Sequence, residues 1–356
     1  RSVSAPAVQG TMTSEQALRQ LLAGSGLIYT MAGSTVAIER PAVQGADGAI
    51  VLDPVTVEGQ AGTMGQAQLG NLPPAYPGGQ VARGGQLGLL GNQDVFDVPF
   101  SVTSYTSELM QNQNAKTIAD VVQNDSSAYS INAERSPTNT IAIRGFNTGG
   151  NSGPLYDGLD GLSHRRFSTV ENLERVEIFK GANSLLTGAV GRVGGTVNLV
   201  PKRPLDTSLT QLTATYEPEA RGGLQADISR RFGSDDQFGA RFNGIFQDGE
   251  SVRENNDDQL KEASMAMDFR SDAFRTSVIL DYSGRELEAA NQLFNNVASV
   301  PDAPDTGAAV QQPWEVTTND FVRGLVRMEY DFAEDWMVHG ALGATEFDGK
   351  FLRTTG

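Results

Sequence analysis

The stretch that decides the fold is ENLERVEIFKGANSLLTGAVGRVGGTVNLVPKRP, residues 171–204. Charged and apolar side chains alternate over Glu174–Lys180, which is the period of a β-strand. Residues 184–186 predict a short helical turn between glycines that allow tight bends. A second strand is predicted at 195–200 and ends at Pro201, because proline cannot donate a hydrogen bond to a strand ladder. The stretch therefore predicts a compact strand–turn–strand unit.

Composition narrows the range of functions. The chain has 356 residues, no cysteine and a formal net charge of −16. This acidity argues against a nucleic-acid partner, because phosphate binding needs clustered Lys and Arg. Without cysteine there is no disulfide framework and no thiolate ligand or nucleophile, and the two histidines, His164 and His339, lie far apart in sequence. No catalytic residue, resident cofactor or metal ligand is therefore predicted, and no enzymatic activity.

The first 40 residues have the pattern of a small α/β unit. Residues 13–24 predict one amphipathic helix, and residues 27–31 and 35–39 predict two strands joined by a turn. One helix and one hairpin bury little core, so we expect residues 1–40 to be part of a larger domain.

Residues 41–93 are rich in Gly, Gln, Ala and Pro and predict a flexible linker. One short β-prone segment, IVLDPVTV at 50–57, interrupts it. An extended apolar segment within flexible chain is suited to adding a strand to the sheet edge of a partner.

A folded region is predicted from Asp94 onward. Residues 96–105 are strand-like, and helical stretches follow near 107–110 and 115–123. The second helix is expected to bury one apolar stripe formed by Ile118, Val121 and Val122.

In the remainder of the chain apolar and polar side chains alternate strictly. In one segment, for example, Phe238 and Phe242 face one way while Arg241 and Asn243 face the other. Seven such segments are predicted, at 209–217, 222–232, 237–247, 261–271, 274–284, 320–332 and 335–347. No apolar run approaches the roughly 18 residues of a membrane-spanning helix. Segments of about ten alternating residues are instead typical of a transmembrane β-barrel.

The lengths of the connections favour a membrane barrel over a water-soluble β-sandwich, which is the alternative. The turns at 233–236, 271–273 and 333–334 are short, whereas the loops at 248–260 and 285–319 are long. Aromatic residues gather at both strand ends, as in two membrane girdles: Phe232, Phe238, Phe274, Phe332 and Trp336 beside the short turns, and Tyr216, Phe246 and Tyr282 opposite them. Seven strands alone would leave unpaired edges in lipid. We therefore expect an unclosed arc and a chain that is cut at both ends.

Several motifs, in order, resemble those of TonB-dependent siderophore receptors of the Gram-negative outer membrane. They are LGLLGN at 87–92, VPFSVTSY at 98–105, TIADVV at 117–122, IRGF at 143–146, YDGL at 156–159 and the stretch at 171–204. The resemblance implies an α/β plug domain at 94–204 and an antiparallel transmembrane β-barrel whose first strands occupy 205–356. Residues 1–40 resemble the second half of a periplasmic signalling domain, the secretin and TonB short N-terminal domain. An unrelated small α/β fragment is the alternative for that part.

The resemblance also implies partners and a function. Residues Leu52, Asp53, Pro54, Val55, Thr56 and Val57 resemble the TonB box, which pairs with the C-terminal domain of TonB. The implied function is binding and active import of a ferric siderophore, with iron present only as part of the ligand. Residues 1–40 would signal to a periplasmic anti-sigma regulator. The barrel would lie in outer-membrane lipid and the N-terminal region in the periplasm.

Individual site residues follow from the same resemblance. Arg144 and Arg175 match plug positions that pair with barrel-wall glutamates, and solvated arginines are the alternative. The apical loops at 132–139, 147–154 and 161–167 are expected to face the ligand. The candidate contacts are Arg135, Asn147, Tyr156, His164, Arg165, Arg166 and Phe167. For each of them a solvated side chain without ligand contact is the alternative.

Other functions stay open at this point. Within transport, the rival is a receptor for haem, cobalamin or a glycan. A passive porin is less favoured, because a covalently attached plug would block its lumen. No nucleophile elbow, zinc motif or paired-carboxylate cleft indicates an enzyme.

Overall fold

The computed structural model describes residues 16, 22, 28–32, 35–39, 43–44, 50–51, 69, 71–132, 136, 138–148, 153–166, 169–188, 192–217, 221–250, 255–290, 312–333 and 336–353. The chain divides into two compact units, residues 1–60 and residues 61–356. Within the described ranges, no helix combines the length and the apolar character needed to cross a membrane.

The described residues of the first unit form two small antiparallel strand pairs. Strand β1 (Ile28–Ala32) pairs with β2 (Thr35–Glu39), which confirms the predicted hairpin. Strand β3 (Val43–Gln44) pairs with β4 (Ile50–Val51) inside the predicted linker. The predicted helix at 13–24, apart from Gln16 and Leu22, and the segment at 52–57 lie outside the described residues.

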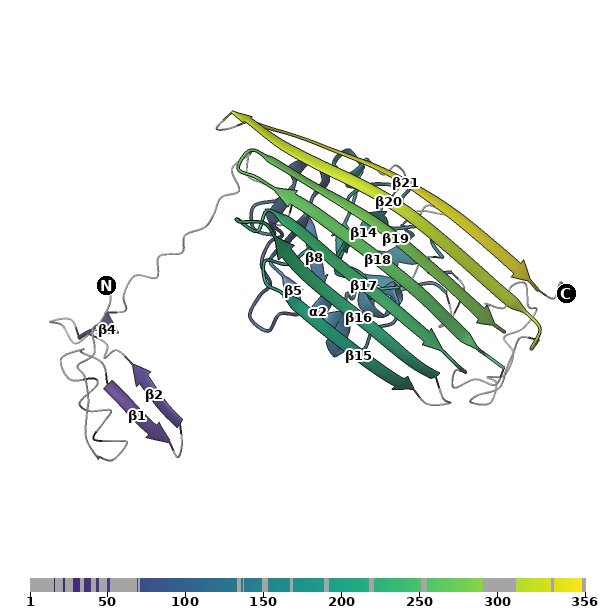
Figure 1. The fold of residues 1–356 in the computed structure, drawn as a ribbon, viewed down its shortest axis with the longest axis horizontal. Coiled ribbons are helices and arrows are strands. Elements are labelled where there is room, and N and C mark those ends of the chain that lie inside the picture. The colour runs from purple at the N-terminus through teal and green to yellow at the C-terminus, as the bar shows by residue number, and fades with distance from the viewer. Residues whose placement is uncertain are drawn as a thin grey trace. The chain divides into compact units, whose positions relative to one another are not determined.

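The second unit begins with a domain built on a five-stranded sheet in the order β12-β14-β13-β8-β5 (Figure 1). Its strands are β5 (Val81–Ala82), β8 (Ser101–Thr106), β12 (Leu155–Tyr156), β13 (Leu173–Lys180) and β14 (Gly195–Pro201). Strands β13 and β14 are antiparallel and flank the short helix α4 (Ser184–Thr187). The predicted strand–turn–strand unit is therefore confirmed, and it supplies two of the three central strands.

Two short helices cover this sheet. Helix α2 (Ser107–Asn112) and helix α3 (Ile118–Val122) are capped by Thr106 and Thr117 respectively. The apolar stripe predicted for the second helix is confirmed, since Ile118, Val121 and Val122 are fully buried. A three-stranded sheet follows, with β9 (Ala128–Ser130), β10 (Ile141–Ile143) and β11 (Phe146–Asn147) in the order β11-β10-β9.

The predicted linker at 41–93 extends too far toward the C-terminus. Residues 81–94 form β5, β6 (Gly84–Gln86), the 3-10 helix η1 (Gly88–Leu90) and β7 (Asn92–Asp94). Strand β5 pairs with β8, and the buried backbone N–H of Gln86 donates to both carboxylate oxygens of Glu177. Glycine and glutamine in this stretch allow close packing against the sheet, which composition alone could not distinguish from flexibility.

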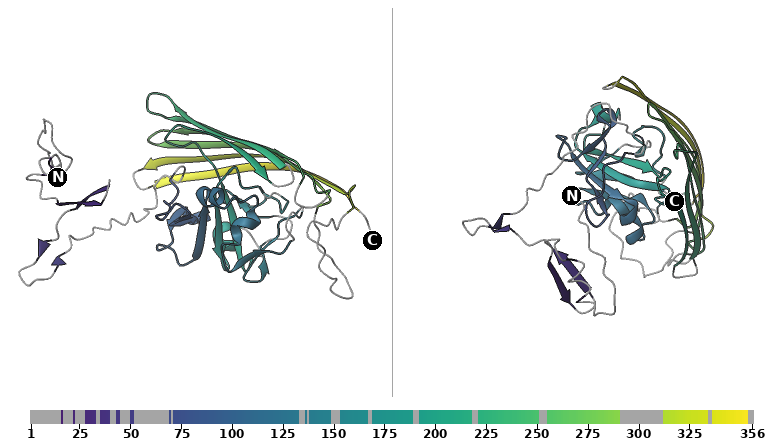
Figure 2. Two further views of the ribbon diagram at one scale, coloured as in Figure 1. Left: turned by 90° about the horizontal axis from the view of Figure 1, so that it is seen from below. Right: turned by 60° about the vertical axis from the view of Figure 1, so that its left-hand side comes forward.

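The second unit ends in one antiparallel sheet of seven strands in sequence order. They are β15 (Leu209–Glu217), β16 (Arg221–Phe232), β17 (Phe238–Asp248), β18 (Asp258–Arg270), β19 (Phe274–Glu288), β20 (Val316–Ala333) and β21 (Trp336–Leu352). All seven predicted segments are confirmed, and β18–β21 are longer than predicted. The sheet curves beside the first domain as an open wall (Figure 2), and we call these two parts the plug and the wall.

The two faces of the wall have opposite chemistry. Phe238 and Phe242 are 50% and 41% exposed on the outer face, whereas Arg241 and Asn243 on the same strand are buried toward the plug. Aromatic rings line the short-turn end: Phe238 lies 5.0 Å from Phe269 between ring centroids. In a soluble β-sandwich the apolar face of each sheet points inward, whereas here the apolar face points outward, as in a membrane barrel.

Candidate functional site

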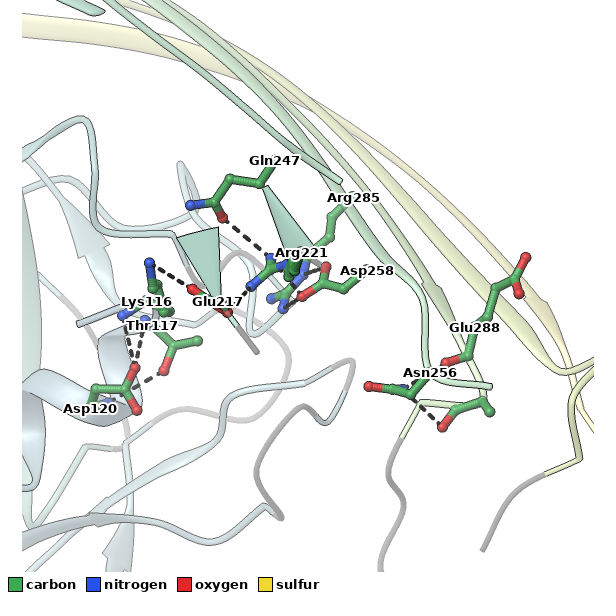
Figure 3. Close-up of polar contacts among 11 residues, drawn as sticks. Lys116, Thr117, Asp120, Glu217, Arg221, Gln247, Asn256, Asp258, Arg285 and Glu288 are labelled. Carbon is green, nitrogen blue, oxygen red and sulfur yellow. Dashed lines mark hydrogen bonds and ion pairs between the residues drawn. The ribbon is translucent and has the colours of Figure 1, made fainter. Parts of the chain in front are cut away.

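The end of the wall that carries the long loops holds a chain of ion pairs starting on the plug (Figure 3). Lys116 of the plug lies 2.9 Å from Glu217 at the end of β15. Glu217 pairs with Arg221 of β16 at 3.2 Å, and Arg221 pairs with Asp258 of β18 at 2.8 Å. Arg285 of β19 also pairs with Asp258 at 2.8 Å. Alternating charges thus connect the plug to the ends of four wall strands, β15, β16, β18 and β19.

Local backbone structure positions the plug end of this chain. Thr117 caps helix α3 and forms a capping box with Asp120, whose carboxylate accepts the backbone N–H groups of Lys116 and Thr117, each at 2.9 Å. On the wall, the Asn256 side chain donates to the carbonyl of Glu288 at 2.7 Å. Hydrogen bonds to the backbone therefore hold both the plug side and the wall side of this series of ion pairs (Figure 3).

A polar cavity of about 290 Å³ lies between the plug and these strand ends. Its plug side carries short polar side chains from two segments, among them Ser130, Asn132 and Asn139. Its wall side carries Arg221, Asp258 and Arg285. The cavity offers many hydrogen-bond donors and acceptors to an oxygen-rich ligand. Among the described side chains, no group of three or more His, Asp and Glu is placed to hold a metal ion.

A second group of side chains meets the wall at the same end. The His164 ring stacks on Phe347 of β21 with 4.5 Å between centroids, and the guanidinium of Arg166 lies 3.7 Å from the ring centroid of Phe351. Arg166 and Arg285 both line a further small cavity. Three of the predicted ligand residues, His164, Arg165 and Arg166, therefore lie together on the long-loop side.

The other predicted ligand residues fall in different places. Asn147 is exposed at the end of β11, apart from the residues that line the 290 Å³ cavity. Arg135 and Phe167 lie outside the described residues. The prediction for Tyr156 is wrong for this arrangement, because its side chain is completely buried between plug and wall. Its aromatic ring and hydroxyl serve the interface and are closed to a ligand above the plug.

Tyr156 joins the plug to two wall strands. Its hydroxyl donates to the carboxylate of Asp281 on β19 at 2.6 Å. Arg323 on β20 donates to the same carboxylate at 3.0 Å, and its guanidinium carbon lies 3.2 Å from the centroid of the Tyr156 ring. Burial raises the pKa of Tyr156 well above its usual value of 10, so the hydroxyl keeps the proton that it donates.

Asp157, the next residue, forms a second attachment. Its carboxylate accepts from Arg203 at 2.6 Å and from Arg327 of β20 at 3.0 Å, and Arg327 also donates to its backbone carbonyl. Asp157 is completely buried, and burial opposes its charge. The two arginines outweigh that effect and lower the pKa of Asp157 to about 2. The carboxylate therefore stays ionised as the anchor of the plug.

Lys116–Glu217 has the polarity predicted for plug–wall pairs, a plug cation beside a wall glutamate, but other observed pairs have the opposite polarity. Glu174 of the plug, rather than an arginine, faces a wall residue, with its carboxylate 3.6 Å from Arg241. Arg175 is buried and donates to the carbonyl of Pro73 at 2.5 Å, within the plug side of the unit. Arg144 is exposed in a turn with a φ of 53°. Pairing of Arg144 and Arg175 with glutamates stays a prediction, because no such pair occurs among the described residues.

Strand β20 carries three of these contacts on its inner face. Arg323 donates to the carbonyl of Leu162 at 2.9 Å, and Arg327 holds Asp157. Glu329 accepts the backbone N–H of Leu69 at 2.9 Å, where the chain enters the plug. Alternation in the sequence predicts that these three side chains share one face. It could not identify their partners, because those lie 160 or more residues away and depend on how the plug sits.

Two segments of the chain match known family models. Residues 94–196 match the family model described as the TonB-dependent Receptor Plug Domain. Residues 3–41 match the model described as the Secretin and TonB N terminus short domain.

Relatives and solved structures agree with these matches. The ferrichrome receptor FcuA of Yersinia enterocolitica is 37% identical over 298 residues, which are 82% of this chain and 39% of that receptor. The ferric-pyoverdine M114 receptor PbuA of a Pseudomonas strain is 31% identical over 58% of this chain and 24% of its own length. The crystal structure of BauA, the ferric preacinetobactin receptor of Acinetobacter baumannii, is 30% identical with a TM-score of 0.73 and covers 78% of this chain and 42% of its own. The chain thus spans about two fifths of FcuA and of BauA.

Proposed function

We propose that this chain belongs to the TonB-dependent receptors, β-barrel proteins of the outer membrane whose plug and N-terminal domain face the periplasm. We propose further that the protein binds a ferric siderophore at the cell surface and imports it actively. The long-loop end of the wall is then the outer side and the short-turn end the periplasmic side. Among the proteins that it resembles are receptors for ferrichrome, ferric pyoverdine and ferric preacinetobactin.

The observation that carries this proposal is the polar interface between plug and wall. Arg241, Arg323 and Arg327 of the wall all bind plug groups through ion pairs or hydrogen bonds. Such contacts hold a plug in one position, and water can replace them when the plug is displaced. In an apolar interface of the same area, water could not replace the lost contacts in this way.

The energy for displacement would come from a partner on the periplasmic side. We assign segment 52–57 as the TonB box, which adds a strand to the C-terminal domain of TonB. A pull on this segment reaches the plug at Leu69, whose backbone N–H is held by Glu329 of the wall. We also propose that residues 1–40, most of which match the Secretin and TonB N terminus short domain, report loading to a periplasmic anti-sigma regulator.

Uptake by cells that produce the full-length receptor tests this function. Radiolabelled ferric chelates should accumulate in cells with TonB and should bind without accumulating in cells that lack it. Val55→Pro removes one N–H donor from the TonB box, so uptake should fall to background while surface binding is kept. Gln66→Pro, in the same part of the linker but outside the box, is the matched control and should leave uptake unchanged. Equal uptake by Val55→Pro and the control would contradict the assignment of the TonB box.

Separate measurements distinguish the proposed function from import of another nutrient and from a passive porin. Haem, cobalamin or a glycan would be taken up in place of ferric chelates, and for cobalamin or a glycan expression would not be repressed by iron. A porin would pass small solutes through planar bilayers without TonB. The comparisons place the family among receptors and transporters, so no enzymatic step is part of the proposal.

A further inference from the structure

Four basic side chains gather near the outer end of β21. His164, Arg165 and Arg166 come from one plug loop, and Arg353 follows β21 itself. Arg166 lies 3.7 Å from the Phe351 ring centroid and 5.9 Å from that of Phe347, and Arg353 lies 5.0 Å from that of Phe351. We call these side chains and the two rings the basic–aromatic cluster.

The cluster has no carboxylate of its own among the described residues. Three guanidinium nitrogens, Nε of Arg165 and both Nε and Nη1 of Arg166, are buried without a hydrogen-bond partner. Burial and the charges of Arg165 and Arg353 lower the pKa of Arg166 to about 10, and no acidic group contributes to this shift. Elsewhere on the same wall, Arg221 and Arg285 share Asp258 and Arg323 has Asp281. The cluster therefore differs from the rest of the interface.

Guanidinium nitrogens that are buried without a hydrogen-bond partner are costly, and an incoming anion that accepts from them would lower that cost. The backbone N–H of Arg166 donates to Nδ1 of His164 at 3.3 Å, so this nitrogen is unprotonated and His164 adds no fixed charge. The fixed positive charge lies on three arginines. Arg285 lines both the 290 Å³ cavity and the small cavity that contains Arg166, so a ligand in the first cavity is adjacent to the cluster.

We propose that the cargo is a ferric chelate with net negative charge, and that the basic–aromatic cluster selects it over neutral chelates. This inference rests on the proposed function. Three hydroxamates neutralise a ferric ion, whereas catecholates and hydroxycarboxylates leave the complex anionic. Arginine binds such oxygen anions through two parallel hydrogen bonds, and the phenylalanine rings keep the guanidinium groups in place.

The test measures binding of three probes to the purified full-length receptor by fluorescence quenching: a ferric tris-catecholate, ferric citrate and a neutral ferric trihydroxamate. Wild type should bind at least one anionic probe about tenfold more tightly than the neutral one, and added salt should weaken only anionic binding. The two anionic probes distinguish catecholate from carboxylate cargo. Arg166→Gln and Arg353→Gln should each weaken anionic binding about tenfold and leave neutral binding unchanged.

The matched control is Arg83→Gln, which removes an arginine that pairs with Asp94 in the plug, outside the cluster. It should change none of the affinities. Tight binding of the neutral probe alone, or anionic binding unaffected by Arg353→Gln and by salt, would overturn the inference and leave the proposed function intact. Failure to bind any ferric chelate would overturn both.

Discussion

The hydroxyl of Tyr156 on the plug donates to the carboxylate of Asp281 on the wall at 2.6 Å, and Arg323 shares that carboxylate. The contact is completely buried on the tyrosine side. It lies one residue from the Asp157 contact to Arg327, so a single turn carries two attachments of the plug to β19 and β20. Displacement of the plug from the wall, as proposed above, would have to break both attachments of this turn.

Tyr156→Phe should loosen the plug without removing the ring from the interface. The change deletes one hydrogen bond to a charged group, which contributes roughly 1.5–3 kcal/mol. Asp281 keeps Arg323, so the loss should lie at the lower end of that range. Hydrogen exchange of the backbone amides of β12 and β14 in the full-length receptor should become faster, while the amides of β17 should not change. Identical exchange in the variant and wild type would show that the hydroxyl is not an anchor.

Removal of the Asp157 charge should cost more. Asp157→Asn leaves Arg203 and Arg327 buried beside a neutral group, and breaking a buried pair costs roughly 3–5 kcal/mol. Arg327→Gln should destabilise the plug by a similar amount. The double variant should lose less unfolding free energy than the sum of the two single losses, because each change removes the partner of the other. Strict additivity in a double-mutant cycle, measured by urea unfolding of the plug, would rule out direct coupling.

Glu177 should make plug stability depend on pH. Burial raises the pKa of Glu177 from 4.5 to about 7, and hydrogen bonds from Asn198 and Gln86 only partly oppose this. The folded plug therefore binds the proton more tightly than the unfolded chain. The resulting stability is fully present below pH 4.5 and is lost as pH rises through about 7, at about 1.4 kcal/mol per pH unit between these values.

Hydrogen exchange between pH 5 and pH 8, corrected for its intrinsic pH dependence, measures this effect at the backbone amide of Gln86, which donates a hydrogen bond to Glu177. Protection should decrease with rising pH in the wild type. In Glu177→Gln the same amide should show a flat profile. A flat profile in the wild type as well would mean that Glu177 does not titrate in this range.

The outer face of the wall should reject charge. Phe242 is 41% exposed near the middle of β17. Phe242→Arg should destabilise the inserted barrel by roughly 2–4 kcal/mol, as expected for arginine at the bilayer midplane. Phe242→Leu is the matched control and should insert normally. Folding yield into lipid vesicles gives the comparison, and equal yields would indicate that this face does not meet lipid.

Much of the fold could be predicted from local pattern. Alternation of side chains defined the seven wall strands and their lipid-facing side, because strand faces repeat every two residues whatever the partner. The stretch at 171–204 likewise predicted its own two strands and short helix. The end of the linker was predicted wrongly, since Gly-rich chain at 81–94 is ordered by contacts with β8 and Glu177 that composition does not encode.

The site itself divides along the same line. By itself the sequence determined which residues are basic and which wall side chains point inward. Only the tertiary structure decided that Tyr156 is buried, that plug carboxylates meet wall arginines, and that Arg166 and Arg353 share the Phe351 ring with no acid paired to them among the described residues. These pairings join residues far apart in the chain, and their energies depend on distance and burial, which exist only once the plug is seated against the wall.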